Sequence, residues 1–421
     1  MADLFALSDN ILNSDTSSDK PFGRVNHELS ELDNGLSFVE AFSNSVNFST
    51  DEGLVIVDTS SVRGGQRVVD AIEHWRPEDR FNSLIYTHGH VDHVGGSGAF
   101  IASAAENKKP NIEIYGHENV SDRFSRYDLT NGYNQIINHR QFGTELSGSF
   151  LPEDAGAPTV TYQKYLNIQK GDVEFELHYA KGETDDHTWI WVPKYKAICA
   201  GDFFIWNFPN AGNPQKVQRF PLEWAAAMRA MAAKKPEYFL PAHGLPIRGA
   251  DQITKVLNNC AFVLEHLVKE TLSMMNNGAR KNEIIHTVKV DQKLLDLPYL
   301  RPLYDEPEFV INNIWRLYGG WYDGNPANLK PAPESSLATE IANLAGGSLN
   351  LGNRAMEIAD KNDYRLACHL IEYAVNADPS NKLLHSMRSK IYRSRIAEES
   401  SLMSKGIFGH ASKESKKISD S

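Results

Sequence analysis

The chain has 421 residues, of which 41% are hydrophobic and 23% charged, and its formal net charge is −11 at neutral pH. This length exceeds what one ordinary hydrophobic core supports, so we expect more than one domain. The acidic balance argues against a clustered basic surface of the kind that binds nucleic acids. Three widely spaced cysteines without a Cys-x-x-Cys pair indicate reduced thiols rather than a disulfide framework.

The N-terminal segment, residues 1–24, is polar and acidic, and it has no apolar run followed by a small-residue cleavage site. We expect it to form a loose arm or a strap over the next domain. No stretch of the chain approaches the roughly 18 consecutive apolar residues of a membrane span. The expectation is therefore a cytoplasmic protein with no integral membrane segment.

Strand and helix signals alternate in residues 25–250, which predicts an α/β domain. Residues 53–59 form an almost wholly apolar run typical of a buried strand. Residues 64–75 have the apolar spacing of a helix. The remaining strands are predicted at 35–40, 45–49, 81–86, 112–115, 173–177, 189–192 and 197–200.

Strand signals stop after Asp251, and helical spacing recurs at 253–276, 337–359 and 364–376. We therefore expect an all-α domain over residues 251–395. Residues 396–421 are expected to form a disordered tail, because Lys, Ser and Gly dominate from residue 404 onward and large apolar side chains are few.

The motif His88-x-His90-x-Asp92-His93 follows the short strand at 81–86 and therefore lies on a turn at its carboxyl end. Imidazole and carboxylate groups are ligands that zinc selects. These four groups cannot all reach one tetrahedral ion that keeps an open position. We expect two ions, with His88 and His90 on one and Asp92 and His93 on the other.

More ligands are available at strand ends further along the chain: His187, Asp202 and His243. His187 would complete a three-histidine set, His243 would join Asp92 and His93, and Asp202 would bridge both ions. Each has an ordinary alternative, since an aspartate that follows a strand is about as often a helix cap.

His-x-His-x-Asp-His, a Gly-x-x-x-x-His loop, Gly-Asp and Pro-x-His-Gly follow one another in the order of the metallo-β-lactamase superfamily, which residues 30–250 resemble. The resemblance implies an αββα sandwich with a dinuclear site along one edge. It also implies that Asp58 supports the site from behind the ligands, although a capping role is an equal alternative.

Two divalent ions, most simply Zn²⁺, hold a water between them and lower its pKa toward ~7, which supplies a bridging hydroxide. Asp92 is the expected catalytic residue, because a carboxylate beside this nucleophile can orient it or shuttle its proton, besides serving as a ligand.

The helical region resembles the dimerisation domain of the alkylsulfatase branch, which implies a homodimer. The resemblance lies in the order of its segments, above all Tyr318–Pro326, although core packing accounts for most of their aromatic side chains. Alkylsulfatases carry glutamates at the third-ligand and bridging positions, where this sequence was matched with His187 and Asp202. They also continue into a C-terminal sterol-carrier-like domain, and this chain ends near where that domain would start.

A small-molecule sulfuric ester needs cationic or amide donors around its oxygens. The guanidinium of Arg219 could bind two such oxygens at once. Asn207, Asn213 or Tyr133 could donate further hydrogen bonds, although a surface ion pair explains Arg219 equally well. His117 follows a predicted strand and could line the pocket, but a structural role is the more common one.

Three hypotheses follow. The first is a sulfuric-ester hydrolase of the alkylsulfatase type, and the second is a hydrolase of another bond, such as a lactone, thioester, phosphoester or β-lactam. The third is a dimeric scaffold with a structural metal site. The full ligand set argues against the third, since structural zinc sites are closed and mononuclear.

Overall fold

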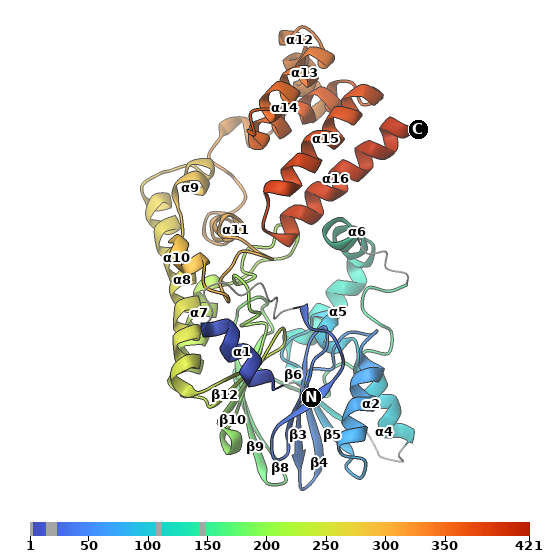
Figure 1. Cartoon of the computed structure of the whole chain (residues 1–421), viewed down its shortest axis with the longest axis vertical. Helices are drawn as coiled ribbons and strands as arrows, with labels where there is room; N and C mark the ends of the chain where they lie inside the picture. The colour runs from blue at the N-terminus through green and yellow to red at the C-terminus, as the bar shows by residue number, and fades with distance from the viewer. Residues whose placement is uncertain (1–2, 14–22, 107–111, 144–147) are drawn as a thin grey trace. The chain divides into compact units, whose positions relative to one another are not determined.

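The computed structural model describes residues 3–13, 23–106, 112–143 and 148–421 (Figure 1). The chain forms two compact units. The first comprises Met1–Asn134, Leu146–Ala279 and Glu283–Gly320, and the second comprises Gln135–Glu145, Arg280–Asn282 and Trp321–Ser421.

The first unit contains a seven-stranded sheet whose strands are neighbours in sequence order. Its strands are β1 (Leu29–Asp33), β2 (Leu36–Val39), β3 (Ser45–Thr50), β4 (Gly53–Val57), β5 (Phe81–Ile85), β6 (Glu113–His117) and β7 (Val160–Tyr162). Strands β1 to β4 pair antiparallel, and β4 to β7 pair parallel. The parallel pairing places the carboxyl ends of β4 and β5 at the same edge of the sheet.

A six-stranded sheet has the order β13-β12-β11-β10-β9-β8. Its strands are β8 (Tyr165–Lys170), β9 (Val173–Tyr179), β10 (Thr188–Val192), β11 (Ala197–Gly201), β12 (Tyr238–Pro241) and β13 (Ile247–Arg248), with the 3₁₀ turn η2 (Pro193–Tyr195) before β11. Only β11 and β12 pair parallel among these strands. The two sheets pack face to face, as the ring contact of Phe48 and Phe175 at 5.2 Å shows.

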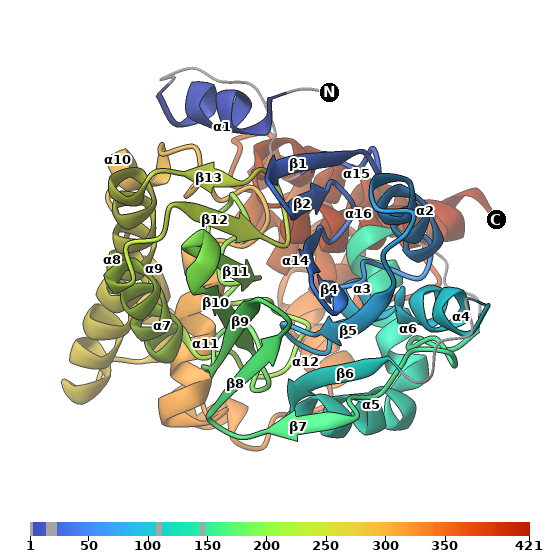
Figure 2. The same cartoon turned by 90° about the horizontal axis from the view of Figure 1, so that it is seen from below.

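Helices cover the outer faces of both sheets, as Figure 2 shows. The first sheet is covered by α2 (Gly65–Trp75), α4 (Ser97–Glu106) and α5 (Asn119–Leu129), which share a buried apolar cluster with β4 and β5. The second is covered by α7 (Pro221–Ala233) and α8 (Ala250–Asn276). This is the αββα sandwich that the resemblance to the superfamily implies. The apolar runs and helical spacings form strands and helices where expected because each buries one face or stripe.

The other helices up to residue 320 are α1 (Leu4–Asn13), α3 (Val91–Val94), α6 (Asn131–Phe142), α9 (Lys281–Thr287), α10 (Gln292–Leu295) and α11 (Pro307–Gly319). Most of α6 belongs to the second unit. Helix α1 lies in the segment expected to be an arm. Leu4 and Ile11 are buried in the main core, and Phe5 contacts the ring of Tyr238 at 5.6 Å. Residues 14–22 of the same segment lie outside the described residues.

The expected domain boundary near residue 250 is wrong, because the first compact unit continues to Gly320. The physical reason is the apolar face of α8. Ile253, Val256 and Leu257 are fully buried in the same core as the second sheet and α7. The helix that follows the last strand is therefore a layer of the sandwich.

The second unit contains the 3₁₀ turn η3 (Pro326–Asn328) and the helices α12 (Glu334–Leu344), α13 (Ser348–Ala359), α14 (Tyr364–Ala377), α15 (Lys382–Glu398) and α16 (Leu402–Asp420). Its core is built largely from alanines and from branched residues such as Ile371 and Leu384. Among the described residues, no helix is both long and apolar enough to cross a bilayer.

The expected disordered tail is also wrong, because residues 402–420 form α16. Ser412 and Ser415 are buried, and Ser412 donates to the backbone oxygen of Ser389 on α15 at 2.9 Å. At Gly406 an added Cβ would lie 1.8 Å from the backbone oxygen of Gln141, so no larger residue fits there. Small residues here allow close packing, and their low hydrophobicity does not mean disorder.

Candidate metal centre

The histidine motif occupies the turn that follows β5. His90 is the N-cap of α3, a single helical turn that presents Asp92 and His93. Gly95 and Gly96 follow, and at Gly96 an added Cβ would lie 2.0 Å from the backbone oxygen of Thr59. The turn therefore packs directly against the end of β4.

Asp58, which follows β4, holds this turn from behind. Its carboxylate accepts hydrogen bonds from the Thr87 backbone N–H at 2.8 Å, from the Thr87 hydroxyl at 2.7 Å and from His93 Nδ1 at 2.7 Å. Because Nδ1 of His93 is engaged by Asp58, its Nε2 is the nitrogen available to a metal. Asp58 has a left-handed backbone with φ 59°, a strained conformation that this bonding supports.

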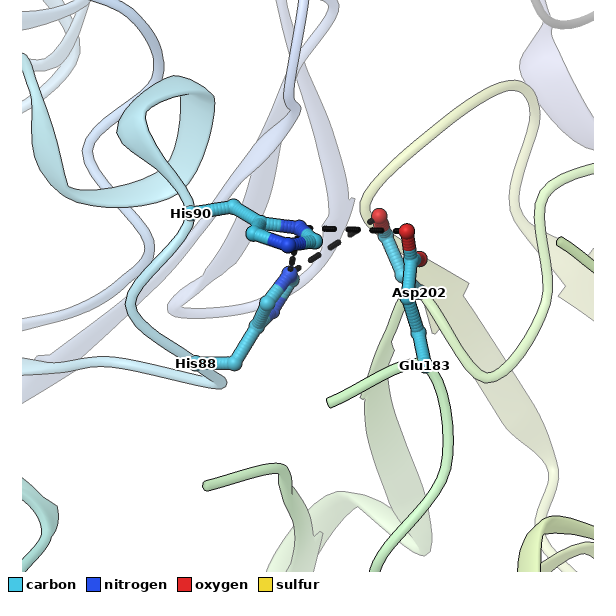
Figure 3. Close-up of side chains that lie close together, drawn as sticks. All are labelled: His88, His90, Glu183 and Asp202. Carbon is cyan, nitrogen blue, oxygen red and sulfur yellow. Dashed lines mark hydrogen bonds and ion pairs between the residues drawn. The ribbon is translucent and has the colours of Figure 1, made fainter. Parts of the chain in front are cut away.

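Four side chains meet on one side of the site: His88, His90, Glu183 and Asp202. Each offers one ligand atom, and these atoms lie within 4.8 Å of one another. Figure 3 shows the two imidazoles pointing across the gap toward the two carboxylates. The two histidines come from the turn after β5 in the first sheet, and the two acids flank β10 and β11 of the second.

A second group consists of Asp92, His93 and His243. Nε2 of His243 lies 3.4 Å from Asp92 Oδ2, and His243 follows β12. The carboxylate of Asp202 faces both groups. Its Oδ1 lies 3.3 Å from His93 Nε2 and 3.4 Å from His243 Nε2, whereas its Oδ2 lies 3.9 Å from His88 Nε2.

Burial and charge set the protonation of these groups. Burial holds the pKa of His88 and of His90 well below the usual histidine value, so both rings are neutral and able to bind a cation. Burial opposes ionisation of Asp92, but His93 and His243 outweigh it and lower the pKa of that carboxyl to about 2. The carboxylates of Asp202 and Asp58 likewise overcome burial and raise the pKa of His93.

His187 was expected as the third ligand of the first group, and the structure does not place it there. Its Nε2 accepts the backbone N–H of Asp202 at 3.2 Å, and its ring stacks on Phe203 at 4.2 Å. Burial lowers the pKa of His187 to about 3. The ring packs beneath the ligands and positions the backbone of Asp202.

Glu183 takes the place expected for His187, and the sequence analysis missed it. A backbone hydrogen bond from the Ala180 N–H to the oxygen of His187, at 3.0 Å, closes the base of the loop between β9 and β10. Glu183 lies near the middle of this loop, so it reaches the site while residue 187 stays at the base. The sequence signal was present, since Glu183 directly follows Gly182 in the same loop that was matched to the family.

The other acids of this loop have a different partner. Arg123 on α5 is buried and donates from Nε and Nη2 to Asp186, at 2.8 Å each, and from Nη2 to Asp185 at 2.6 Å. Asp186 also accepts the backbone N–H of Gly89 at 2.9 Å. The loop is thereby tied to the histidine turn.

Arg219 is buried and lies beside the first group, where it forms an ion pair with Glu183. Its Nη1 also donates to the backbone oxygen of Asn210 at 2.8 Å. Within the described part of the chain, the Nε of Arg219, Oδ1 of Asn207 and Nδ2 of Asn213 are buried without a hydrogen-bond partner. Tyr133, by contrast, is 58% exposed on α6.

Lys216 and Tyr304 also lie within electrostatic range of Glu183, Arg219 and Asp92. Burial, followed by the Arg219 charge, lowers the pKa of Lys216 to about 8.

His117 has the structural role expected for it. Its Nε2 lies 2.9 Å from the backbone oxygen of Gln163, and its ring stacks on Tyr179 at 3.9 Å.

Two family descriptions match the chain. Residues 39–243 match the metallo-beta-lactamase superfamily, and residues 280–417 match the alkyl sulfatase dimerisation family. The first match spans both ligand groups, and the second spans the helical region.

The chain is similar to several alkylsulfatases. A linear primary-alkylsulfatase from Pseudomonas sp. is 25% identical over 81% of this chain and 68% of its own length. An (R)-specific secondary-alkylsulfatase from Pseudomonas sp. is 26% identical over 79% of this chain and 54% of its own length. An alkyl/aryl-sulfatase from Saccharomyces cerevisiae is 25% identical over 80% of this chain and 56% of its own length.

The solved structure of a stereoselective inverting sec-alkylsulfatase from Pseudomonas sp. has the same fold. It superposes with a TM-score of 0.81 at 22% identity, covering 91% of this chain and 64% of that protein. The chain therefore spans between 54 and 68% of the length of these relatives.

Proposed function

Because this chain is an alkylsulfatase-like protein of the metallo-β-lactamase superfamily, we propose that it hydrolyses sulfuric esters of the alkyl sulfate type with two divalent metal ions. One observation carries the proposal. Seven imidazole and carboxylate side chains converge in two adjoining groups, and both groups share Asp202.

The residues fit the ions that the family implies. Among the described residues, His93 Nε2, Asp202 Oδ1 and Glu183 Oε2 are buried and form no hydrogen bond of good geometry, although His93 Nε2 and Asp202 Oδ1 lie 3.3 Å apart. Buried polar atoms left unpartnered are costly, and bound cations would satisfy all three. An imidazole and carboxylate set is the kind that Zn²⁺ accepts.

In this proposal His88, His90 and Glu183 would hold one ion and Asp92, His93 and His243 would hold the other, with the Asp202 carboxylate facing both groups. Such ions would supply an activated water and polarise the ester. Asp92 is the proposed catalytic residue that would orient the attacking water. Its low pKa keeps it ionised at neutral pH, which suits an orienting ligand better than a proton acceptor.

Arg219 and the asparagines beside it supply the proposed ester-binding surface. The Nε of Arg219 and Nδ2 of Asn213 are donors without a partner among the described residues, and Asn207 lies in the same loop. Guanidinium and amide donors suit the oxygens of a monoanionic sulfate ester. Tyr133 is not part of the proposed surface, because among the described residues its exposed side chain does not contact these groups.

Release of inorganic sulfate from primary and secondary alkyl sulfates tests the proposal, with lactones, thioesters, phosphoesters and β-lactams run beside them. Metal content is measured on the same samples by mass spectrometry. We expect sulfate release with about two zinc ions per chain, and loss of both metal and turnover in His90→Ala and Asp202→Ala. Turnover that persists in chelator-treated, metal-depleted protein would contradict it, as would turnover confined to another ester class.

We also propose that the chain forms a homodimer through its helical region. The family match at 280–417 supports this, as do large apolar side chains exposed on the second unit. Trp321 is 70% exposed and Leu344 is 89% exposed. Light scattering coupled to size exclusion should give twice the chain mass, and Leu344→Glu should reduce it.

A further inference from the structure

The side chain of Asn313 on α11 pairs with both backbone groups of Arg219, and Gln218 Nε2 also donates to the backbone oxygen of Arg219 at 2.8 Å. Nδ2 of Asn313 donates to the backbone oxygen of Arg219 at 2.9 Å, and its Oδ1 accepts the backbone N–H of Arg219 at 3.3 Å. Asn313 thus engages both backbone groups of one residue, as a neighbouring strand would. This pairing fixes the direction in which the Arg219 side chain leaves the backbone.

The Oδ1 atom of Asn313 accepts two further hydrogen bonds. Gln218 donates from Nε2 at 2.9 Å, and Arg316 donates from Nη2 at 3.0 Å. Asn313 is only 4% exposed, although Arg316 itself is exposed at the surface. An amide meets both demands at this position, because it has one oxygen that accepts and one nitrogen that donates.

The same segment of the chain holds the loop that precedes Arg219 at two more points. The backbone oxygen of Arg301 accepts the N–H of Phe208 at 3.0 Å, and Asp305 Oδ2 accepts the N–H of Gly212 at 2.6 Å. At Gly212 an added Cβ would lie 2.3 Å from the backbone of Phe309, so the contact is tight. Loop 207–219 is therefore held by residues 301–313 along its length.

We propose that Asn313 is a positioning residue that aims the Arg219 guanidinium at Glu183 and at the anionic group of the substrate, an inference that rests on the proposed function. The side chain of Arg219 is buried. Its Nη1 donates to the backbone oxygen of Asn210, and its Nε has no hydrogen-bond partner among the described residues. A shift of about 1 Å in such a group reduces catalysis by up to about a hundredfold. Asn313 itself touches neither ligand group.

Asn313→Ala and Asn313→Asp test this inference, with Asn312→Ala as the matched control. Asn312 is the adjacent asparagine on α11, and among the described residues its Nδ2 bonds within that helix, to the oxygen of Glu308 at 2.9 Å. The aspartate variant keeps the shape and the acceptor but loses the donor to Arg219. It gives a second measurement if the alanine variant does not fold.

Binding of inorganic sulfate by calorimetry, KM, kcat and zinc content are measured for each variant. We expect Asn313→Ala to weaken sulfate binding and raise KM about ten- to a hundredfold, with Asn313→Asp in between and zinc content unchanged. Asn312→Ala should match the wild type.

Two results would overturn the inference: Asn313 variants with the sulfate affinity and KM of Asn312→Ala, or variants that lose zinc and kcat in parallel, which indicates a purely structural role. Failure of the proposed function is recognisably different. In that case the wild-type protein itself neither binds sulfate nor releases it from alkyl sulfates.

Discussion

Replacing Glu183 by glutamine separates its role in metal binding from its role in folding. In the metal-free protein, burial raises the pKa of the Glu183 carboxyl to about 8. At pH 7 the raised pKa favours the protonated form, and the carboxyl contacts the Arg219 guanidinium in either form. Glutamine resembles this neutral form and can still accept from Asn210, whose Nδ2 donates to Glu183 Oε1 at 2.6 Å. We expect the free energy of unfolding of the metal-free protein to change by less than about 1 kcal/mol.

Metal binding should respond strongly to the same change, because a neutral amide oxygen is a poor substitute for a carboxylate ligand. Even partners that only orient a ligand contribute about 10- to 100-fold to metal affinity, so loss of the ligand itself should exceed that. We expect one zinc ion per chain in Glu183→Gln, retained by Asp92, His93 and His243, and turnover below about 1% of wild type. Mass spectrometry of metal content and urea unfolding of the metal-free protein measure the two effects separately.

His187→Gln is the matched control, since it alters the other candidate in the same loop. Its amide oxygen can accept the Asp202 N–H, but the stacked contact with Phe203 is lost. We expect two zinc ions per chain and a loss of about 1–3 kcal/mol in stability. The opposite pattern, with two ions in Glu183→Gln and one in His187→Gln, would refute the assignment of Glu183 as ligand.

Three further predictions concern proton release on zinc binding, the contribution of Asp58 to zinc affinity, and the pH dependence of stability. Zinc binding at pH 7 should release protons, because Glu183 and His93 have raised pKa values and must deprotonate to bind a cation; calorimetry in buffers of different ionisation enthalpy measures the release, and none would contradict it. Asp58→Asn should weaken zinc binding about 10- to 100-fold, whereas Asp79→Asn, whose partner is Ser49, should not. Burial raises the pKa of Asp305 to about 7, so the folded state binds its proton more tightly and stability should fall, on the order of 4 kcal/mol, as pH rises from about 4 to 7. Urea unfolding across this range should show a flatter profile in Asp305→Asn, and an identical slope would refute the reasoning.

The strands and helices of the sandwich could be predicted from the sequence because they follow from local pattern, whereas their αββα arrangement was implied by the family resemblance. The buried run at 53–59 and the spacing at 64–75 correspond to β4 and α2. The histidine motif was equally accessible, since its four groups lie within six residues. Features that depend on what packs against a segment could not be predicted from the sequence. The spacing at 253–276 predicts a helix, but only the contacts of α8 assign it to the sandwich rather than to a separate domain.

The loop from Gly182 to His187 shows this limit at the metal centre. It contains four possible ligands in five positions: Glu183, Asp185, Asp186 and His187. The resemblance to the superfamily favoured the histidine, because imidazole is the commoner third ligand there. The choice is made by residues far along the chain, since Arg123 engages both aspartates and Asp202 occupies His187. Glu183 is left to face His88 and His90. The resemblance itself contained the missing hint, because alkylsulfatases carry glutamate at the third-ligand position. With Glu183 as the proposed third ligand, Asp202 is the position at which the proposed ligand set still departs from the glutamates that the resemblance implies.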